Sequence, residues 1–327
     1  MATHEREITD PVDLCEPSGR LNADAVDWTR TSLHRCNLRG WGRTKRWEYW
    51  CITTPTHLVA VTVSSLDYLG VNNIYFLEYG GREINRNSVL PLARGVTLPT
   101  SHGDGPTSAR GAIAVDIDDE PGGTRIRFSC NTIHGPLAGD LTVAMPPGHE
   151  TLGVVVPWSA DKFQYTAKHT VRPASGTVRI GERTYDFAGG WGVLDHGRGR
   201  WPAVVQWNWG AASGHTDGHV VGLQFGGKWT VGTGMTENAL CVDGRLTKIG
   251  AELSWNYREY LEPWSIRTPD TDQVDVVFIN DHCVPSGCAN GDRNLYVDYV
   301  VVNGSTLQAE SNQVTYDRGA GATAFDG

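Results

Sequence analysis

Short runs of alternating apolar residues, divided by glycine turns, constrain the fold of this 327-residue chain more than any other feature. In "RGAIAVDIDDEPGGTRIRFSC" (110–130), apolar and polar residues alternate on both sides of a Pro-Gly-Gly turn. Successive side chains of a β-strand point to opposite faces, so this pattern predicts two strands that each bury one face. "VNNIYFLEYGGREI" (71–84) and "GTVRIGERTYDF" (176–187) repeat it. The sequence therefore predicts an all-β fold of the sandwich or barrel kind.

Two similar segments indicate how the chain divides. "GRTKRWEYW" (42–50) and "GRGRWPAVVQWNW" (197–209) both run from basic residues into paired tryptophans, as if each opened one β unit. We expect a first β unit over residues 1–155 and a second, holding the main cavity, over residues 156–275. Residues 276–327 are expected to form a β tail. Helical periodicity is scarce, and only residues 21–29 and 160–167 are predicted to form short helical turns.

Charge and composition exclude several classes of function. The net charge is −9, whereas nucleic-acid-binding proteins need clustered Lys and Arg, so the one short basic cluster, residues 39–46, does not indicate a nucleic-acid partner. No apolar run approaches the roughly 20 residues that span a bilayer. The polar N-terminal residues lack the apolar core of a secretory signal, and we expect a cytoplasmic protein.

The seven cysteines fit that compartment, since five of them are scattered and are predicted to be free thiols. Cys283 and Cys288 flank a Pro-Ser-Gly turn, and a disulfide between them remains an alternative.

The segment "GVLDHGRGRWPAVVQWNWG" (192–210) holds the strongest candidate site. If it is a strand, Asp195 and His196 point to opposite faces, and Arg198 and Arg200 share the face of His196. The glycines between the charges predict a bulge or a bend. Asp195 is either a general acid or base among indoles, or a carboxylate paired with one of the arginines beneath Trp201.

Two further groups extend this candidate site. Trp207 and Trp209 share a face of a regular strand, where they form either a wall that holds a substrate or ordinary core packing. Glu237 and Asn238 follow a glycine-rich turn. Glu237 is a second candidate acid, because paired carboxylates serve glycoside hydrolysis, or it simply accepts backbone hydrogen bonds. His34 is a candidate binding residue, with a structural role as its alternative.

Many motifs of the chain resemble the bacterial family DUF2804. They include "HRCNLRGWGRTKRWEYW", "FQYTAK", "LDHGRGRWP", "WNWGAASG" and "GGKWTVGTGMTENAL", and they cover about residues 6–276. Wider relatives of that family look like the two-unit, lipocalin-like proteins typified by carotenoid hydratase. The resemblance implies a pair of β-barrels with a tryptophan-lined cavity, where Asp, His, Trp and Tyr handle protons at apolar substrates. Val231 stands where an Asp is expected in the family's "WTxGTG" stretch, which puts the activity of this copy in doubt.

The tail resembles another family. "VVFINDHCVPSGCANGDRNLYVDYVVVNGSTLQAE" (276–310) is similar to the second half of the calcium-dependent xylan-binding modules of secreted enzymes. That resemblance implies that Asp281 and Asp292 hold calcium, a cation that prefers oxygen ligands. The alternative is that these strands complete the preceding fold.

Together these observations predict an acid–base enzyme of the hydratase, hydrolase or isomerase type that acts on a small apolar or glycosidic molecule. Asp195 or Glu237 is expected to donate the proton, and His196 or Arg198 to tune that acid. Trp201, Trp207 and Trp209 are expected to hold the substrate, and the main cavity needs no cofactor. Two alternatives stay open: a non-catalytic, calcium-dependent binder of polysaccharide such as xylan, and a carrier of lipid or isoprenoid.

Overall fold

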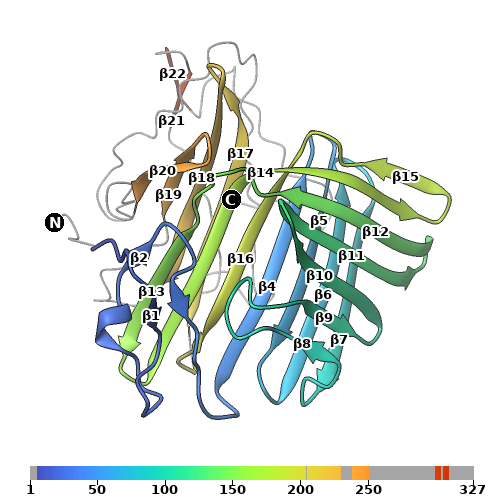
Figure 1. Cartoon of the computed structure of the whole chain (residues 1–327). Coiled ribbons are helices and arrows are strands. Elements are labelled where there is room, and N and C mark those ends of the chain that lie inside the picture. Colours follow the sequence, from blue (N-terminus) through green and yellow to red (C-terminus); the bar gives the residue numbers. More distant parts are fainter. Residues whose placement is uncertain (1–5, 204, 230–237, 250–298, 303–304, 309–327) are drawn as a thin grey trace. The chain divides into compact units, whose positions relative to one another are not determined.

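The computed structural model describes residues 6–203, 205–229, 238–249, 299–302 and 305–308. Strands make up almost all of the regular structure there, so the all-β prediction is confirmed (Figure 1). A single 3₁₀ turn, η1 (Ala23–Ala25), confirms the helical turn predicted in residues 21–29. The one predicted in residues 160–167 is wrong, because residues 163–168 lie in a strand, between β13 and β16.

The described strands run in chain order as follows: β1 (Val12–Asp13), β2 (Trp28–Thr29), β3 (His34–Arg35), β4 (Thr44–Thr53), β5 (His57–Ser65), β6 (Leu69–Glu78), β7 (Glu83–Pro91), β8 (Val96–Thr97), β9 (Thr107–Arg110), β10 (Ile113–Glu120), β11 (Gly123–Thr132), β12 (Gly135–Ala144), β13 (Leu152–Ser159), β14 (Lys162–Ile180), β15 (Arg183–Asp186), β16 (Gly190–Arg200), β17 (Gln206–Thr216), β18 (His219–Trp229), β19 (Ala239–Val242), β20 (Arg245–Ile249), β21 (Tyr299–Val302) and β22 (Ser305–Gln308).

One large sheet organises the described part of the chain. Its strand order is β7-β6-β5-β4-β16-β14-β12-β11-β10-β9-β8, and β2, β13 and β15 attach beside β14. The hairpins predicted around Gly80 and Gly122 are present as β6–β7 and β10–β11. At the centre, the 19-residue strand β14 pairs with β16 and β13 in its first half and with β12 and β15 in its second. A register shift between His169 and Arg172 marks the change of partner.

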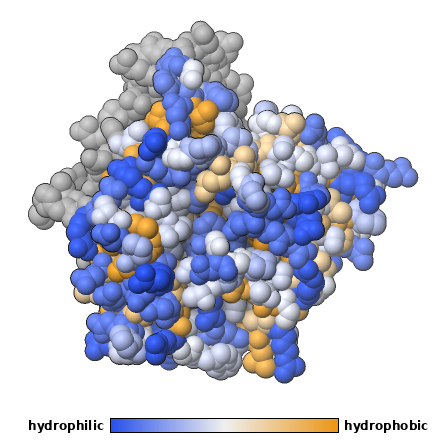
Figure 2. All heavy atoms as spheres, in the orientation of Figure 1, coloured by the Kyte–Doolittle hydropathy of each residue, from blue (hydrophilic) through white to orange (hydrophobic). Residues whose placement is uncertain are grey.

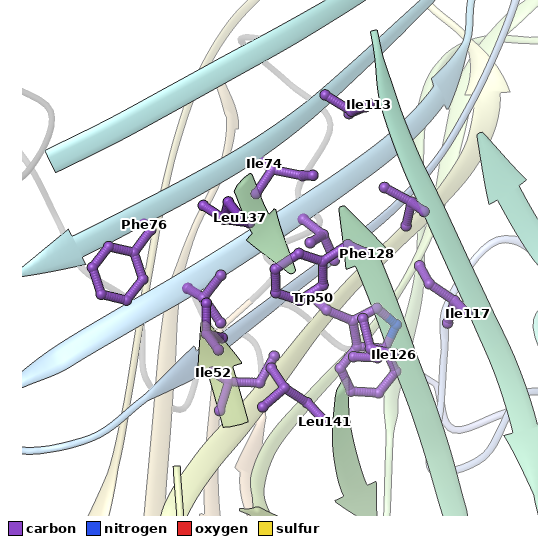
Figure 3. Packing of buried hydrophobic residues seen from close by; sticks show 14 of the residues in the cluster. Trp50, Ile52, Ile74, Phe76, Ile113, Ile117, Ile126, Phe128, Leu137 and Leu141 are labelled. Atoms are coloured by element: carbon purple, nitrogen blue, oxygen red, sulfur yellow. The ribbon is translucent and has the colours of Figure 1, made fainter. Parts of the chain in front are cut away.

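The sheet curls around one hydrophobic core. Inward residues of β4–β7 meet those of β9–β12 across it, and β10 and β11 contact β6 and β7 face to face. Figure 3 shows this packing around Trp50, Phe76 and Phe128, all at most 4% exposed. Burying a side chain of this size contributes roughly 1.5–3 kcal/mol to the free energy of folding. The core therefore stabilises the curvature of the sheet, which positions the polar residues beside it. A second core, with Leu14 and Cys36, packs on the first half of β14.

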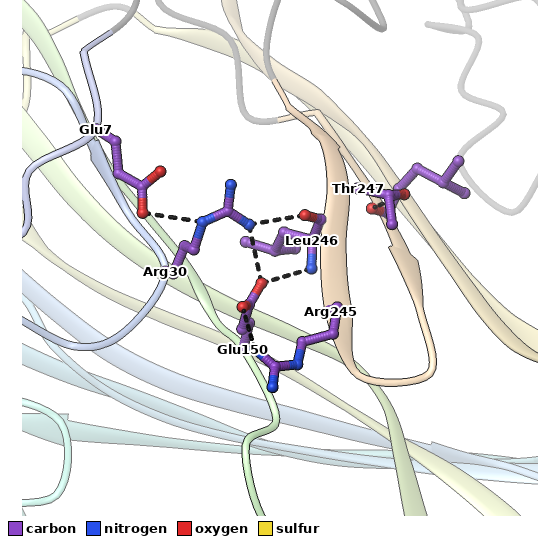
Figure 4. Close-up of polar contacts among 7 residues, drawn as sticks. Glu7, Arg30, Glu150, Arg245, Leu246 and Thr247 are labelled. Atoms are coloured by element: carbon purple, nitrogen blue, oxygen red, sulfur yellow. Dashed lines mark hydrogen bonds and ion pairs between the residues drawn. The ribbon is translucent and has the colours of Figure 1, made fainter.

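A smaller sheet, β17-β18-β19-β20, packs near the shift in β14 through a third core that includes Val171 and Cys241. A network of charged groups connects β20 of this smaller sheet to residues of the large unit's earlier segments (Figure 4). Arg30 donates to Glu150 Oε2 at 3.0 Å and to the Leu246 carbonyl at 2.7 Å, and the same Glu150 oxygen accepts the Leu246 N–H at 2.7 Å. This network joins three segments that are far apart in the sequence.

The predicted domain boundary at residue 155 lies inside β13, and β4 and β16, on either side of it, pair over ten residues. The two predicted β units thus share one sheet, and their division stays a prediction. By compactness the chain forms one unit of Met1–His215 with His219–Ser254, and another of Thr216–Gly218 with Trp255–Gly327. In the second unit β21 and β22 form an antiparallel hairpin. The predicted boundary near residue 275 lies outside the described residues.

The described surface is mixed in character. On the face shown in Figure 2, hydrophobic residues are scattered among hydrophilic ones. Within the described part of the chain, no helix is long and apolar enough to cross a membrane. The five described cysteines are free thiols, as predicted: Cys15, Cys36, Cys51, Cys130 and Cys241. Cys283 and Cys288 lie outside the described residues.

Candidate functional site

Three adjacent strands, β4, β16 and β14, carry the candidate site, and their register sorts its residues onto two faces. Asp195 lies opposite Tyr49 on β4 and Lys168 on β14, whereas His196 lies opposite Glu48 and Ala167. The prediction that Asp195 and His196 point to opposite faces is therefore confirmed. The predicted bulge at the glycines of β16 is wrong, because the pairing with β4 runs without a break from Trp191 to Arg200.

On the first face, which we call the indole face, the Asp195 carboxylate is closely held. Its Oδ2 lies 3.0 Å from the Lys168 ammonium, and its Oδ1 accepts hydrogen bonds from Thr166 at 3.0 Å and Trp47 Nε1 at 3.3 Å. The side chain of Lys168 is 1% exposed and that of Asp195 17%. Of the two alternatives for Asp195, the pairing with Arg198 or Arg200 is wrong, because these arginines lie on the opposite face and Lys168 is the ion-pair partner.

Aromatic rings cover this ion pair. The Trp201 ring meets Trp47 edge-on at 5.3 Å, and Lys168 Nζ lies 4.5 Å from the centre of the Trp209 ring. Gly197 makes room for this packing, because a Cβ there would overlap the Trp47 ring. The glycine in this motif thus seats an indole rather than bending the strand. Trp201 and Trp209 gather around Asp195 through Trp47 and Lys168, while the side chain of Trp207 lies outside the described residues.

The opposite face, which we call the inner face, holds His196 and Glu48, which are 0% and 4% exposed. The Glu48 carboxylate is satisfied, since it accepts hydrogen bonds from Trp50 Nε1 at 2.9 Å and from Thr107 Oγ1 at 2.5 Å. His196 differs from it, because neither ring nitrogen has a hydrogen-bond partner within the part of the chain that the structure describes. Buried polar groups are nearly always hydrogen-bonded, so these nitrogens are places where a water molecule or a ligand can bind.

His196 is the innermost of four histidines, which we call the histidine row: His102, His149, His169 and His196. Ring centres are 5.3 Å apart between His196 and His102, 5.6 Å between His102 and His169, and 5.7 Å between His169 and His149. His169 is fixed by a hydrogen bond with Thr151 Oγ1. Burial lowers the pKa of all four, and lowers it well below the ordinary value for His169 and His196. The row is therefore a set of neutral imidazoles at neutral pH.

Two buried arginines flank the row. Arg198 donates to four backbone carbonyls and ties the segment at Pro99 and Thr100 to β4 and β16. Arg172 stacks on Trp50 and donates to the carbonyls of Val143 and Ala144 at 2.8 and 2.9 Å. Its Nη1 has no hydrogen-bond partner among the described residues. Burial lowers the pKa of both guanidinium groups to about 10, so both remain charged at neutral pH.

The other predicted site residues are placed as follows. His34 stacks on Tyr165 at 4.6 Å and bonds the Ala25 carbonyl through Nε2 at 2.9 Å, which places it beside the inner face. Asn238 accepts the Gly226 N–H at 2.9 Å, which links β18 to the residue before β19. Glu237, Val231, Asp281 and Asp292 lie outside the described residues, so the second acid and the calcium ligands stay predictions.

Sequence reasoning missed His102, His149, His169 and Arg172. A local signal existed for His169, which interrupts the apolar alternation of Phe163, Tyr165 and Ala167 in β14. Arg172 reaches the same side only through the register shift between His169 and Arg172. His102 and His149 lie in connecting segments without periodicity, so only the fold brings them to the row. Within the described residues, no group of three or more His, Cys, Asp or Glu side chains is placed to hold a metal ion.

Comparisons with known proteins agree with the motifs. The family model DUF2804, described as a domain of unknown function, matches residues 5–282. No curated protein matches the chain. A Nitrosomonas europaea crystal structure provisionally named AttH is similar at 10% identity and a TM-score of 0.37, over 62% of this chain and 67% of that one. Kievitone hydratase from Nectria haematococca is similar at 11% identity and a TM-score of 0.33, over 63% of each chain.

Proposed function

The chain belongs to the DUF2804 family, a family of unknown function, and we propose that it is an acid–base enzyme whose reaction centre is the histidine row. The observation that carries the proposal is His196, a fully buried imidazole with neither ring nitrogen bonded, in ring contact with a second neutral histidine. The substrate is a small molecule, and the reaction is a hydration, a hydrolysis or an isomerisation.

Neutral imidazoles suit this work, because each can accept a proton at one nitrogen while the other remains a donor. In a hydration, His196 removes a proton from water as the water oxygen bonds to carbon. That proton then passes through His102 to the neighbouring carbon, so both rings end neutral. In an isomerisation, the same two rings take a proton from one carbon and deliver one to another. Their centres are 5.3 Å apart, so both reach one small group.

Arg172 supplies the charge that such a reaction needs. Its guanidinium is 1% exposed, has no carboxylate within ion-pair distance among the described residues, and keeps Nη1 unbonded. Negative charge develops on the oxygen of an enolate or a tetrahedral intermediate, and a buried donor with a fixed positive charge stabilises it strongly. We assign Arg172 to that oxygen.

Access to the row requires the segment 98–106 to open, because His102 lies on it, between β8 and β9. Gly103 adopts a positive φ of 84° and gives this segment a turn that most residues avoid. Arg198 holds the closed position through the Pro99 and Thr100 carbonyls. Opening admits the substrate, and closure excludes water from the reaction.

Isotope uptake tests the proposal without knowledge of the substrate. We would incubate the protein with a bacterial metabolite extract in water enriched in ¹⁸O or in ²H and record mass spectra. Hydration and hydrolysis insert ¹⁸O, whereas isomerisation inserts ²H alone. His196→Leu is expected to lower uptake by at least about a hundredfold, the usual size of a general acid–base contribution.

His57→Gln is the matched control. His57 is also buried, but both of its ring nitrogens are bonded, to Thr56 Oγ1 at 2.9 Å and to the Asp186 carbonyl at 3.0 Å. Its ring packs against Phe76 of the large hydrophobic core. This variant is expected to lose stability and to keep isotope uptake per folded molecule. Equal uptake by the wild type and His196→Leu would refute the proposal.

A further inference from the structure

A second feature lies at the ends of β4, β14 and β16, away from the histidine row. Arg43, Lys162 and Arg200 line a surface pocket of about 350 Å³, together with Trp41 and Asp161. These residues come from three segments that are far apart in the sequence: the loop before β4, the start of β14 with the residue before it, and the last residue of β16. We call this feature the basic pocket. Arg43 belongs to the short basic cluster at residues 39–46.

The charges of the basic pocket do not cancel. None of Arg43, Lys162 and Arg200 makes an ion pair within the described residues, although Arg200 donates to the backbone carbonyl of Arg39. The one acid of the lining, Asp161, lies 3.9 Å from Arg20, with both side chains more than half exposed. Three cations therefore face one acid that has a cation of its own. Such an excess in a chain of net charge −9 marks a place where a negative group is attracted locally.

The pocket also has an apolar wall. Trp41 is 68% exposed, the largest exposed aromatic side chain in the described part of the chain. An exposed indole beside cations suits a ligand with a flat ring, which stacks on the indole while its charged end meets the guanidinium groups. The volume matches a small molecule rather than a polymer, and the net negative charge of the protein opposes a polyanion.

We propose that the basic pocket binds a small organic anion, in which a phosphate or carboxylate group is attached to a planar ring. Arg43, Lys162 and Arg200 take the anionic group, and Trp41 stacks on the ring. The proposal uses no residue of the histidine row and does not depend on the reaction proposed there.

Titration calorimetry with phenyl phosphate, benzoate, inorganic phosphate and benzyl alcohol tests this assignment at an ionic strength of about 0.1 M. Phenyl phosphate is expected to bind about tenfold more tightly than inorganic phosphate, because only the ester has a ring to stack. Trp41→Ala should remove that advantage. Lys162→Gln should weaken phenyl phosphate about tenfold, as expected when one close opposite charge is removed. Tighter binding of benzoate than of phenyl phosphate would support the assignment and identify the group as a carboxylate.

Arg179→Gln is the matched control, because Arg179 lies near the far end of the same strand as Lys162 and its loss changes the net charge equally. It should leave affinity within about twofold, since charges beyond a Debye length of about 10 Å are screened. Three results would overturn the proposal: benzyl alcohol binding as tightly as phenyl phosphate, Arg179→Gln matching Lys162→Gln, or a single-stranded oligonucleotide binding more tightly than either small anion.

Discussion

The two faces of β4, β16 and β14 carry polar residues in opposite conditions. On the indole face, Asp195 has an ammonium, a hydroxyl and an indole N–H as partners. On the inner face, His196 is more deeply buried and has no hydrogen-bond partner among the described residues. A satisfied carboxylate stabilises the fold, whereas an unsatisfied imidazole costs free energy in the folded state. The comparison separates a carboxylate committed to structural bonds from an imidazole whose nitrogens are not, which is why we propose His196 rather than Asp195 for the chemistry.

The largest expected effect is the loss of stability when the ion pair of the indole face is broken. Asp195→Asn leaves the Lys168 ammonium buried without its partner, and removal of one member of a buried pair typically destabilises by about 4 kcal/mol. Urea unfolding of the variant measures this loss. Asp195→Asn with Lys168→Met should regain most of it, because the unpaired charge is gone. Isotope uptake per folded molecule should stay at the wild-type level, which also tests the proton-donor role predicted for Asp195 from the sequence.

Asp140→Asn provides the comparison for that loss. Asp140 is ion-paired with Arg125 at 2.8 Å, but its side chain is 52% exposed, so its loss should cost under about 1 kcal/mol. If both variants lose the same free energy, the indole face is not a buried charge pair. If Asp195→Asn abolishes isotope uptake while its fold persists, the reaction belongs to the indole face instead.

Sequence reasoning reached the strands, the hairpins and the two-faced character of β16, because alternation and glycine turns are local signals. It could not separate the two environments, because Asp195 and His196 are neighbours in the chain and only pairing with β4 and β14 shows what each side chain meets. Gly197 is an example of the same limit. Its spacing predicted a bend, yet the reason for a glycine is the Trp47 ring on the neighbouring strand.

A smaller effect is the pH dependence of stability, which arises from the buried histidines on and beside the inner face. Burial lowers the pKa of His34 from 6.5 to about 4. Between these two pH values His34 is protonated in the unfolded chain and neutral in the folded chain. Stability is full above pH 6.5 and falls as the pH drops toward 4, where His34 alone should account for about 3 kcal/mol.

Urea unfolding at pH 7.5, 6, 5 and 4 measures this dependence. His34→Gln should flatten part of the curve, while His134→Gln, which changes an exposed histidine, should leave the curve unchanged. A wild-type stability that does not change between pH 6.5 and 4 would contradict the burial of neutral imidazoles on which the inner face is built.

The smallest effect has the opposite sign. His196→Leu replaces an imidazole without hydrogen bonds by an apolar side chain of similar size, and relief of one buried, unsatisfied polar group is worth about 1 kcal/mol. The variant should therefore be more stable than the wild type while it loses isotope uptake. Such an exchange of stability for activity is expected at an active site. A structural histidine would behave differently, because its removal would cost stability, as we expect for His57→Gln. A loss of stability in His196→Leu would show that its nitrogens do have partners in the folded protein and would remove the difference between the two faces.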